Sequence, residues 1–448
     1  HDILPNRRSQ LGKITEPIRD RQFGKEVFDM TSKERVKCAF SHQQPDKVPL
    51  DFGGMSCSQM HVTIIDKLRK YYGLEPRPIR LWDVFGMTGL IDDDLKDAIG
   101  TDVEMVRAFN GCFGISDTGK WKEYRMFDVD LLVPEQFEVA DDGKGGLLIY
   151  PQGDRAAPPS GHMPAGGYYF DNIERQEEID EDDMHADDNL QEYGPISEAA
   201  LAYYRAELAK YKGSKRAVVL DPGGAALGDA SQIAGPGLKH PKGIRSVADW
   251  YMAPLLYPDY VHEVFRRQTD CVLENWKKLH EIAGDIADII YVCGTDFGAQ
   301  QSQMCSGAAF DEFYMPYYQK VTGWVHENTA WKALKHSCGA VYPFIPKFIE
   351  SGFDALNPVQ CSAAGMEPQR LKDDFGDRIL YWGGGVDTQK VLPFGTPEEV
   401  RRQVLERCEI FSKNGGYIFN SIHIVQYGTP IENVVAMIDA VHEFNGGR

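Results

Sequence analysis

A regular alternation of short apolar runs and helical patterns in the second half of the chain constrains its fold most strongly. The apolar runs occupy residues 217–221, 288–293, 332–336, 353–357, 379–383 and 416–420. Helical periodicity follows at 259–282, 308–328, 342–351, 368–375, 397–413 and 430–444. Strands that alternate with helices in this way form a parallel sheet that is buried on both faces.

Two earlier apolar runs, 47–52 and 102–107, raise the strand count to eight, the number in a closed barrel. A doubly wound open sheet is the alternative, but no GxGxxG motif opens any of these helices in the right context. We therefore predict an α/β fold, a (β/α)8 TIM barrel. Thr31 or Ser32, followed by Glu34, predicts a capped helix at the start of this domain.

The periodicity changes between residues 120 and 195. Strand patterns at 123–127, 131–139 and 146–151 predict antiparallel strands, and residues 151–170 are too rich in Pro and Gly for a helix or a regular strand. We predict an inserted antiparallel β-hairpin layer and an acidic loop over one end of the barrel. The predicted organisation is an N-terminal arm at 1–30 and a single barrel domain at 31–448, with the insertion at about 120–195.

Charge and composition exclude several classes of function. The net charge of −19 argues against nucleic acid, which needs clustered Lys and Arg. Much of the excess lies in an acidic run at 177–188, interpreted as a solvated loop, with a calcium loop or a docking patch as alternatives. No apolar run reaches about 18 residues, and the first residues lack the apolar core of a signal peptide. Nine scattered cysteines fit reduced thiols, so we expect a cytoplasmic protein.

Candidate ligands for a metal follow the ends of the predicted strands. His336 and Cys338 are two residues apart, so in an extended chain their side chains leave on the same face. His423 follows the last predicted strand, and the carboxyl ends of barrel strands meet on one rim. An imidazole, a thiolate and a second imidazole suit zinc. Cys361 or Asp296 is an alternative third ligand, and three ligands with an open fourth position would indicate a catalytic zinc.

Three C-terminal motifs resemble the uroporphyrinogen decarboxylase superfamily. They read HSCGAVYPFIPKFIESGFDALNPVQ, FGDRILYWGGGVDTQKVLPFGTPEEV and FNSIHIVQYGTPIENVVAMIDAV, and the N-terminal TSKERVKCAFSHQQPDKVPLDFG agrees. The resemblance implies a (β/α)8 barrel. True decarboxylases carry an arginine-rich segment, RQAGRY-like, where this chain reads VPLDFGGMSCSQM without arginine. The resemblance therefore favours the zinc-dependent and corrinoid-dependent methyltransferase branch, with His336, Cys338 and a third ligand near the last strand.

One departure from that branch bears on the chemistry. The third position is His423 where the coenzyme M methyltransferases have cysteine. One thiolate and two imidazoles leave Zn²⁺ with a formal charge of +1, which favours polarising an oxygen over holding a nucleophilic thiolate. Asp296 as an additional ligand, in place of water, would return the charge to zero.

The predicted function is zinc-dependent methyl transfer from a small methoxylated compound, an aromatic methyl ether, to the cobalamin of a corrinoid protein. The chain resembles the first methyltransferase of O-demethylase systems in this respect. Asp296 and Asn357 are candidates to orient substrate or a zinc-bound water, and Trp82, Phe85, Phe297 and Gln300 are candidates to bind substrate.

Two alternatives remain open. One is a corrinoid methyltransferase for a methylamine or for a thiol such as coenzyme M, and the other is a metal-free decarboxylase. A homodimer is one possible assembly.

Overall fold

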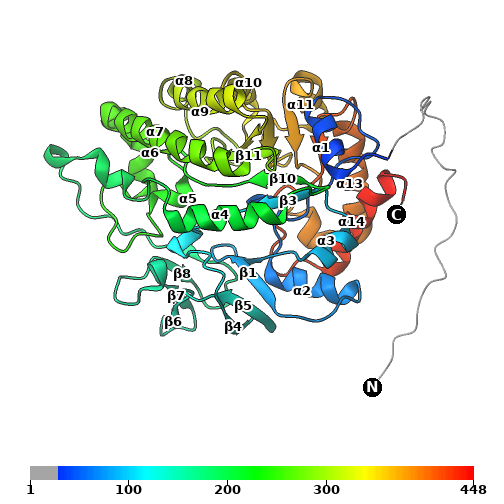
Figure 1. Ribbon diagram of the computed structural model, residues 1–448, viewed down its shortest axis with the longest axis horizontal. Helices are drawn as coiled ribbons and strands as arrows, with labels where there is room; N and C mark the ends of the chain where they lie inside the picture. Colours follow the sequence, from blue (N-terminus) through cyan, green and yellow to red (C-terminus); the bar gives the residue numbers. More distant parts are fainter. Residues whose placement is uncertain (1–28, 448) are drawn as a thin grey trace.

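The computed structural model describes residues 29–447, and a seven-stranded parallel sheet forms its centre (Figure 1). The strand order is β15-β14-β13-β12-β11-β10-β3. The strands are β3 (Val103–Val106), β10 (Ala217–Leu220), β11 (Ile289–Cys293), β12 (Lys332–His336), β13 (Ala355–Asn357), β14 (Leu380–Trp382) and β15 (Tyr417–Ile418). The predicted strand at 102–107 and the six predicted from 217–221 onward all lie in this sheet. The predicted arm at 1–30 lies, except for its last two residues, outside the described part of the chain.

Residues 47–52 connect the two edges of this sheet. Leu50 forms a parallel bridge with Phe419, which follows β15, and its carbonyl accepts a hydrogen bond from the amide of Asp102 beside β3 (2.7 Å). The sheet is therefore curled, as in a TIM-like barrel. The predicted strand at 47–52 is reduced to this bridge, because Pro49 has no N–H to donate to a ladder.

Alternate strand residues fill the inside of the curl. The buried cluster there includes Val219, Ile289, Leu334, Ala355, Leu380 and Ile418. Side chains two residues apart in a strand lie on the same face. His336, Asn357 and Trp382 each stand two residues after a member of this cluster, so they continue its inward rows toward the carboxyl ends of the strands.

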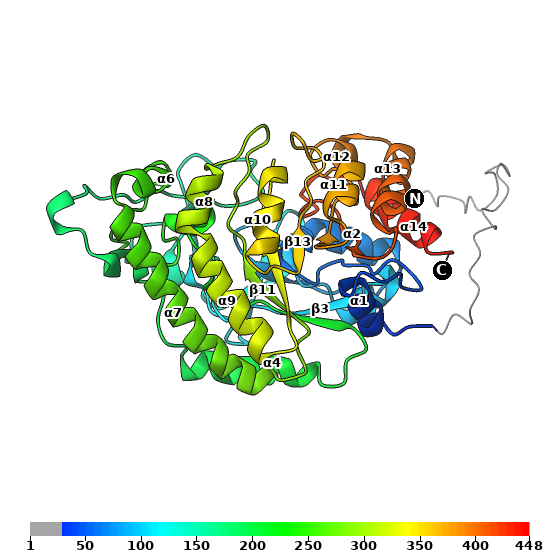
Figure 2. The same ribbon diagram turned by 90° about the horizontal axis from the view of Figure 1, so that it is seen from above.

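Helices cover the outside of the strands (Figure 2). They are α4 (Glu198–Lys210), α5 (Ala230–Ile233), α6 (Val247–Leu256), α7 (Pro258–Ala283), α8 (Gly307–Phe313), α9 (Met315–Asn328), α10 (Ile345–Glu350), α11 (Pro368–Phe375), α12 (Val391–Phe394), α13 (Pro397–Phe411) and α14 (Ile431–Phe444). The single helix predicted at 308–328 is two helices that meet at Tyr314. Pro316 causes this break, because its nitrogen cannot donate to the carbonyl four residues earlier.

Three helices come before β3, the first strand of the central sheet in the chain: α1 (Ser32–Phe40), α2 (Val62–Tyr71) and α3 (Asp93–Ile99). The predicted cap of α1 is confirmed: the Thr31 hydroxyl accepts from the backbone N–H of Glu34 (3.2 Å), and the Glu34 carboxylate accepts from the backbone N–H of Thr31 (2.8 Å).

Two smaller sheets occupy much of the segment between residues 79 and 172. One has the order β2-β1-β5-β4, with β1 (Ile79–Asp83), β2 (Thr88–Gly89), β4 (Trp121–Met126) and β5 (Val129–Pro134). The other contains β6 (Val139–Asp141), β7 (Leu147–Ile149), β8 (Gly161–Met163) and β9 (Asp171–Asn172). The prediction of no regular strand at 151–170 is wrong for β8. Gly161 does not break this strand but packs closely, since a Cβ there would lie 2.5 Å from the Phe113 ring.

The acidic run at 177–188 lies mostly on the surface. Glu181 accepts a hydrogen bond from the Tyr257 hydroxyl (2.6 Å), and Asp187 pairs with Arg267. Within residues 29–447, the clusters of His, Cys, Asp and Glu with metal-ligand spacing contain no residue of this run. None of the helices in the same residues is both long and apolar enough to cross a bilayer. The division into an arm and one domain stays a prediction.

Candidate metal centre

His336 is the central residue of the candidate site. It ends β12 and is 4% exposed. Its Nδ1 lies 2.6 Å from Oδ1 of Asn357, and Nδ2 of Asn357 donates to the carbonyl of Trp382 (2.8 Å). Because the Asn357 oxygen must then be an acceptor, Nδ1 of His336 carries a proton and Nε2 is the nitrogen available to a metal.

Cys338 and Asp296 lie on one side of this imidazole. The Cys338 sulfur is 3.3 Å from Nε2 of His336, and the nearer Asp296 oxygen is 3.8 Å from the same nitrogen. That oxygen also accepts a hydrogen bond from the Cys338 amide (2.6 Å). This hydrogen bond therefore links the end of β12 to the loop after β11, next to His336 and Cys338.

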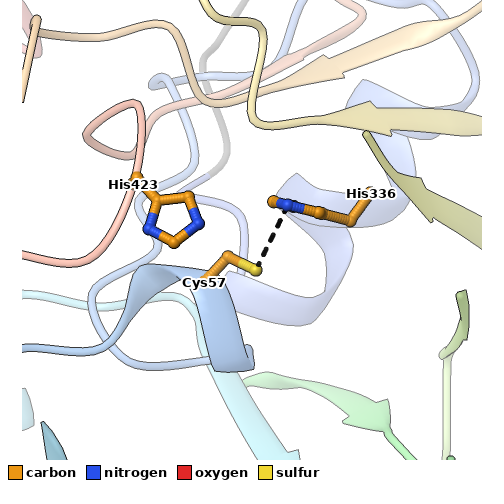
Figure 3. A group of neighbouring side chains, drawn as sticks. All are labelled: Cys57, His336 and His423. Atoms are coloured by element: carbon orange, nitrogen blue, oxygen red, sulfur yellow. Dashed lines mark hydrogen bonds between the residues drawn. The ribbon is translucent and has the colours of Figure 1, made fainter. Parts of the chain in front are cut away.

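Cys57 and His423 approach from the two ends of the chain (Figure 3). Cys57 belongs to a short 3-10 helix (Ser56–Ser58), and its sulfur lies 3.8 Å from Nε2 of His336. His423 follows β15, and its ring centroid is 5.6 Å from that of His336. One ligand atom from each of these three residues lies within 4.8 Å of the others. Folding therefore brings the distant imidazole of His423 beside His336.

The charges of these groups are strongly coupled. Burial alone would raise the pKa of the Cys57 thiol, but the neighbouring His336 and His423 lower it to about 5. Burial likewise opposes the shift at Cys338, whose pKa is lowered chiefly by His336. Hydrogen bonds to the two sulfurs raise the pKa of His423 to about 10 against the effect of burial. Without metal, these shifts favour the thiolate form of the cysteines and the imidazolium form of His423.

The donor set fits zinc. Thiolate sulfur and imidazole nitrogen are its preferred ligands, and the two thiols are already disposed to ionise. Metal binding requires neutral imidazoles and would release their protons. Cys57, His336, Cys338 and His423 are the residues that would hold the ion, with the Asp296 carboxylate beside them.

Cys57 is the donor that the sequence pattern does not reveal. It is one of nine scattered cysteines, and the histidine four residues later, His61, bonds to Thr63 and to the carbonyl of Tyr168. The available signal is its position shortly after residues 47–52. That segment runs parallel to the strands of the central sheet, so its carboxyl end lies on the same side as theirs.

The remaining predicted residues lie in varied surroundings. Asn357 is fully buried behind His336, where it fixes the ring. Phe297, predicted to bind substrate, is 2% exposed and packs between Phe310 and Tyr314, so it belongs to the core between sheet and helices. The alternative ligand Cys361 bonds to the carbonyl of Val359 and is not part of the cluster.

Three predicted substrate residues retain exposure. Trp82 and Phe85 are half-buried at the end of β1. Gln300 is exposed in the loop after β11, where its side chain bonds to Gln360 and to the carbonyl of Ser362.

Three carboxyl groups lie near the cluster: Asp83 ends β1, Asp221 follows β10 and Asp229 caps α5. Burial raises the pKa of Asp221 to about 7, and the nearby Cys57 charge adds to the effect. Burial raises the pKa of Asp229 to about 6, with a contribution from Asp296. Asp83, which also feels the Cys57 charge, has its pKa raised by burial. We call Asp83, Asp221 and Asp229 the acidic wall. The Tyr291 hydroxyl lies 4.0 Å from the Cys57 sulfur, between the wall and the cluster.

Fold and site together define a class of protein: a TIM-like barrel with thiol and imidazole donors gathered where such barrels place their active sites. Residues 240–444 match the family model described as Uroporphyrinogen decarboxylase (URO-D). The predicted resemblance to the uroporphyrinogen decarboxylase superfamily is confirmed, and a methyltransferase is among the relatives that match.

The curated relatives are enzymes of two kinds. The chain is 25% identical over 214 residues to a uroporphyrinogen decarboxylase of Pseudomonas entomophila (strain L48), a match that covers 45% of this chain and 58% of the relative. It is 26% identical over 208 residues to a methylated-thiol–coenzyme M methyltransferase of Methanosarcina mazei, covering 46% and 49%. The chain thus spans about half the length of the curated relatives it matches.

A solved structure matches over nearly the whole chain. It is a methyltransferase from Methanosarcina mazei, with a TM-score of 0.53 and 16% sequence identity, and the match covers 93% of this chain and 99% of that one. This similarity shows the fold.

Proposed function

We propose that this protein is a zinc-dependent methyltransferase that moves a methyl group from a small methylated compound to the corrinoid of a partner protein. The observation that carries the proposal is the pair of ligand groups that share the buried His336, one with Cys57 and His423 and one with Cys338 and Asp296. The similarity to a methylated-thiol–coenzyme M methyltransferase supports methyl transfer.

The residues of the chain would hold zinc and orient its surroundings. Cys57 and Cys338 would bind as thiolates, and Asn357 keeps Nε2 of His336 directed to the ion. Zinc, when bound, would supply a Lewis acid that stabilises charge developing on the heteroatom that loses the methyl group. The carboxylate of Asp296, tied to the Cys338 amide, stands where it can orient the donor.

The presence of Cys57 changes the charge argument. With His423 in place of a cysteine, one thiolate and two imidazoles would leave a formal charge of +1. Two thiolates and two imidazoles leave zero, as in a site with a cysteine at position 423. The formal charge of the site therefore no longer favours an oxygen donor.

A methoxylated aromatic compound is the donor we propose first. A departing phenolate needs a proton, and Asp221, with its pKa raised to about 7, holds one for part of the time at neutral pH. Trp82 and Phe85 offer partly exposed aromatic surface beside Asp83 of the acidic wall.

A methylated amine is the second candidate donor. The acidic wall places Asp83 and Asp221 close enough to the cluster to feel the charge on Cys57. A methylammonium group would offset the repulsion between each of these carboxylates and the charge on Cys57, whereas a neutral ether would not.

The experiment that tests the function uses the zinc-loaded protein with a reduced corrinoid protein. Methoxybenzoates and methylamines are supplied in turn, and cobalt absorbance reports methylation. We expect methylation with methoxybenzoates. Methylation with methylamines alone would replace the first donor by the second. Activity of a protein freed of zinc, or release of CO₂ from a cyclic carboxylate without metal, would favour the decarboxylase instead.

A further inference from the structure

A buried carboxyl group lies beneath the candidate metal centre without a cationic partner. Asp51 is 1% exposed, and within residues 29–447 no Lys, Arg or His lies at ion-pair distance from it. Its oxygens accept instead from the amide of Gly54 (2.7 Å), the hydroxyl of Ser58 (2.9 Å) and the indole N–H of Trp382 (2.8 Å). A buried carboxyl group is costly, so these three donors must compensate for its desolvation.

Two of these donors hold the turn that carries Cys57. Gly54 and Ser58 lie on either side of Cys57 in the chain, and both bond to Oδ1 of Asp51. The turn lies tightly against the barrel, because a Cβ at Gly54 would be 2.1 Å from Cγ2 of Val103. The position of the Cys57 sulfur is therefore tied to the Asp51 carboxyl group.

The third donor connects Asp51 to His336. Trp382 gives its indole N–H to Oδ2 of Asp51, and its carbonyl accepts from the amide of Asn357. The side-chain oxygen of Asn357 accepts a hydrogen bond from Nδ1 of His336. Hydrogen bonds thus extend from Asp51 along one path to the Cys57 turn and along another to His336.

We propose that Asp51 is a positioning residue that sets the Cys57 sulfur against the imidazole of His336, so that the thiolate from the N-terminal part of the chain can join the strand-end ligands. The inference rests on the proposed function, since it concerns ligands of the same metal centre. Asp51 contacts neither the metal ligands nor substrate, and it acts through Ser58, Trp382 and Asn357.

The Asp51→Asn variant breaks one of the two paths while keeping shape and burial. The introduced amide side chain can direct its oxygen either toward Gly54 and Ser58 or toward Trp382. Its NH₂ group then faces the remaining hydrogen-bond donors and cannot accept from them. Asp288→Asn is the matched control. Asp288 is also buried (7% exposed), but it bonds to the amide of Val218 at the opposite end of the strands.

The test uses the full chain loaded with Co²⁺, whose thiolate charge-transfer absorbance reports the number of bound sulfurs. Wild type and Asp288→Asn should show two thiolates, and Cys57→Ser should show one. We expect Asp51→Asn to show the spectrum of Cys57→Ser and to bind Co²⁺ about 10–100-fold more weakly than wild type, while it still melts cooperatively. Ser58→Ala, which removes one donor only, should lie between wild type and Asp51→Asn.

The results that would overturn the inference are distinct from those that would overturn the function. A two-thiolate spectrum and unchanged affinity in Asp51→Asn would reject the positioning role and leave the metal centre intact. The same spectral loss in Asp288→Asn would mean that any buried carboxyl group supports the site, and would also reject it. Wild-type protein that binds no Co²⁺ would reject both.

Discussion

Two cysteine sulfurs lie close to the same imidazole nitrogen in the candidate site. Cys57 and Cys338 lie 3.8 Å and 3.3 Å from Nε2 of His336. If both are ligands, replacing either by serine removes a thiolate from zinc and should lower zinc affinity by at least about tenfold. Zinc per chain after dialysis against a weak chelator measures this effect.

Cys361 provides the control for that substitution, because it stands after a neighbouring strand but outside the cluster. Cys361→Ser should keep about one zinc per chain. Equal loss from Cys361→Ser and Cys57→Ser would contradict the assignment of the ligands.

The coupled charges predict how the metal-free protein responds to pH. The pKa of Cys57 is lowered from 9.0 to about 5, so its stabilising contribution is fully present above pH 9 and is lost as pH falls toward 5. The pKa of His423 is raised from 6.5 to about 10, so its contribution is fully present below pH 6.5 and is lost as pH rises toward 10.

These opposite slopes largely cancel between pH 6.5 and 9. Denaturant titrations of the zinc-free protein should give a free energy of unfolding that is flat in this window and falls on both sides. His423→Ala should reduce the decline on the alkaline side and leave the part due to His336, whose pKa, despite burial, is also raised by the neighbouring thiolates. An alkaline decline of undiminished size in that variant would contradict the coupling.

At the scale of elements, two neighbouring strands build the site together. The side chain of Asn357 at the end of β13 holds the ring of His336 at the end of β12. Asn357→Ala should weaken zinc binding by about 10–100-fold, because the ring loses its fixed tautomer and orientation. Asn357→Asp keeps an acceptor and should retain most of the affinity.

The measurement for this pair is zinc competition with a fluorescent chelator, together with a thermal melt. A melt that collapses for Asn357→Ala, with zinc affinity restored once folding is rescued by low temperature, would show that Asn357 supports the strands and not the ligand.

The regular part of the chain was predictable because its elements depend on local pattern. The strands β10 and β11 are continuous apolar runs, and helical patterns alternate with the strands from β10 to β15. The bridge at Leu50 and the break beside Pro316 were not, because each depends on a single proline that lacks an N–H. The strand around Gly161 was not, because it depends on close packing against Phe113.

The candidate site likewise contains residues that the sequence predicts and residues that it does not. His336 and Cys338 could be found from their spacing, and His423 from its place after a strand. Cys57 could not, because its role depends on the tight turn held by Asp51. Phe297 was assigned to the site from its place after β11, but the alternation of the backbone turns it into the core.

At the scale of the whole molecule, the candidate ligands join segments that are otherwise distant in sequence. Zinc that binds only the folded chain should stabilise it, by about 2.7 kcal/mol when the free metal is at 100 times the Kd. Removal of zinc should therefore lower the Tm of wild type, and the shift should be much smaller in Cys57→Ser. A Tm that is unchanged by zinc in wild type would contradict a site assembled from these segments.

The most direct test of the central claim is X-ray absorption at the zinc edge of the full-length protein. Zinc held by Cys57, His336, Cys338 and His423 predicts about one ion per chain with two sulfur and two nitrogen neighbours, at about 2.3 Å and 2.0–2.1 Å. Cys57→Ser should reduce the sulfur count to one. A stoichiometric zinc with one sulfur neighbour in wild type, or no bound zinc at all, would contradict the account.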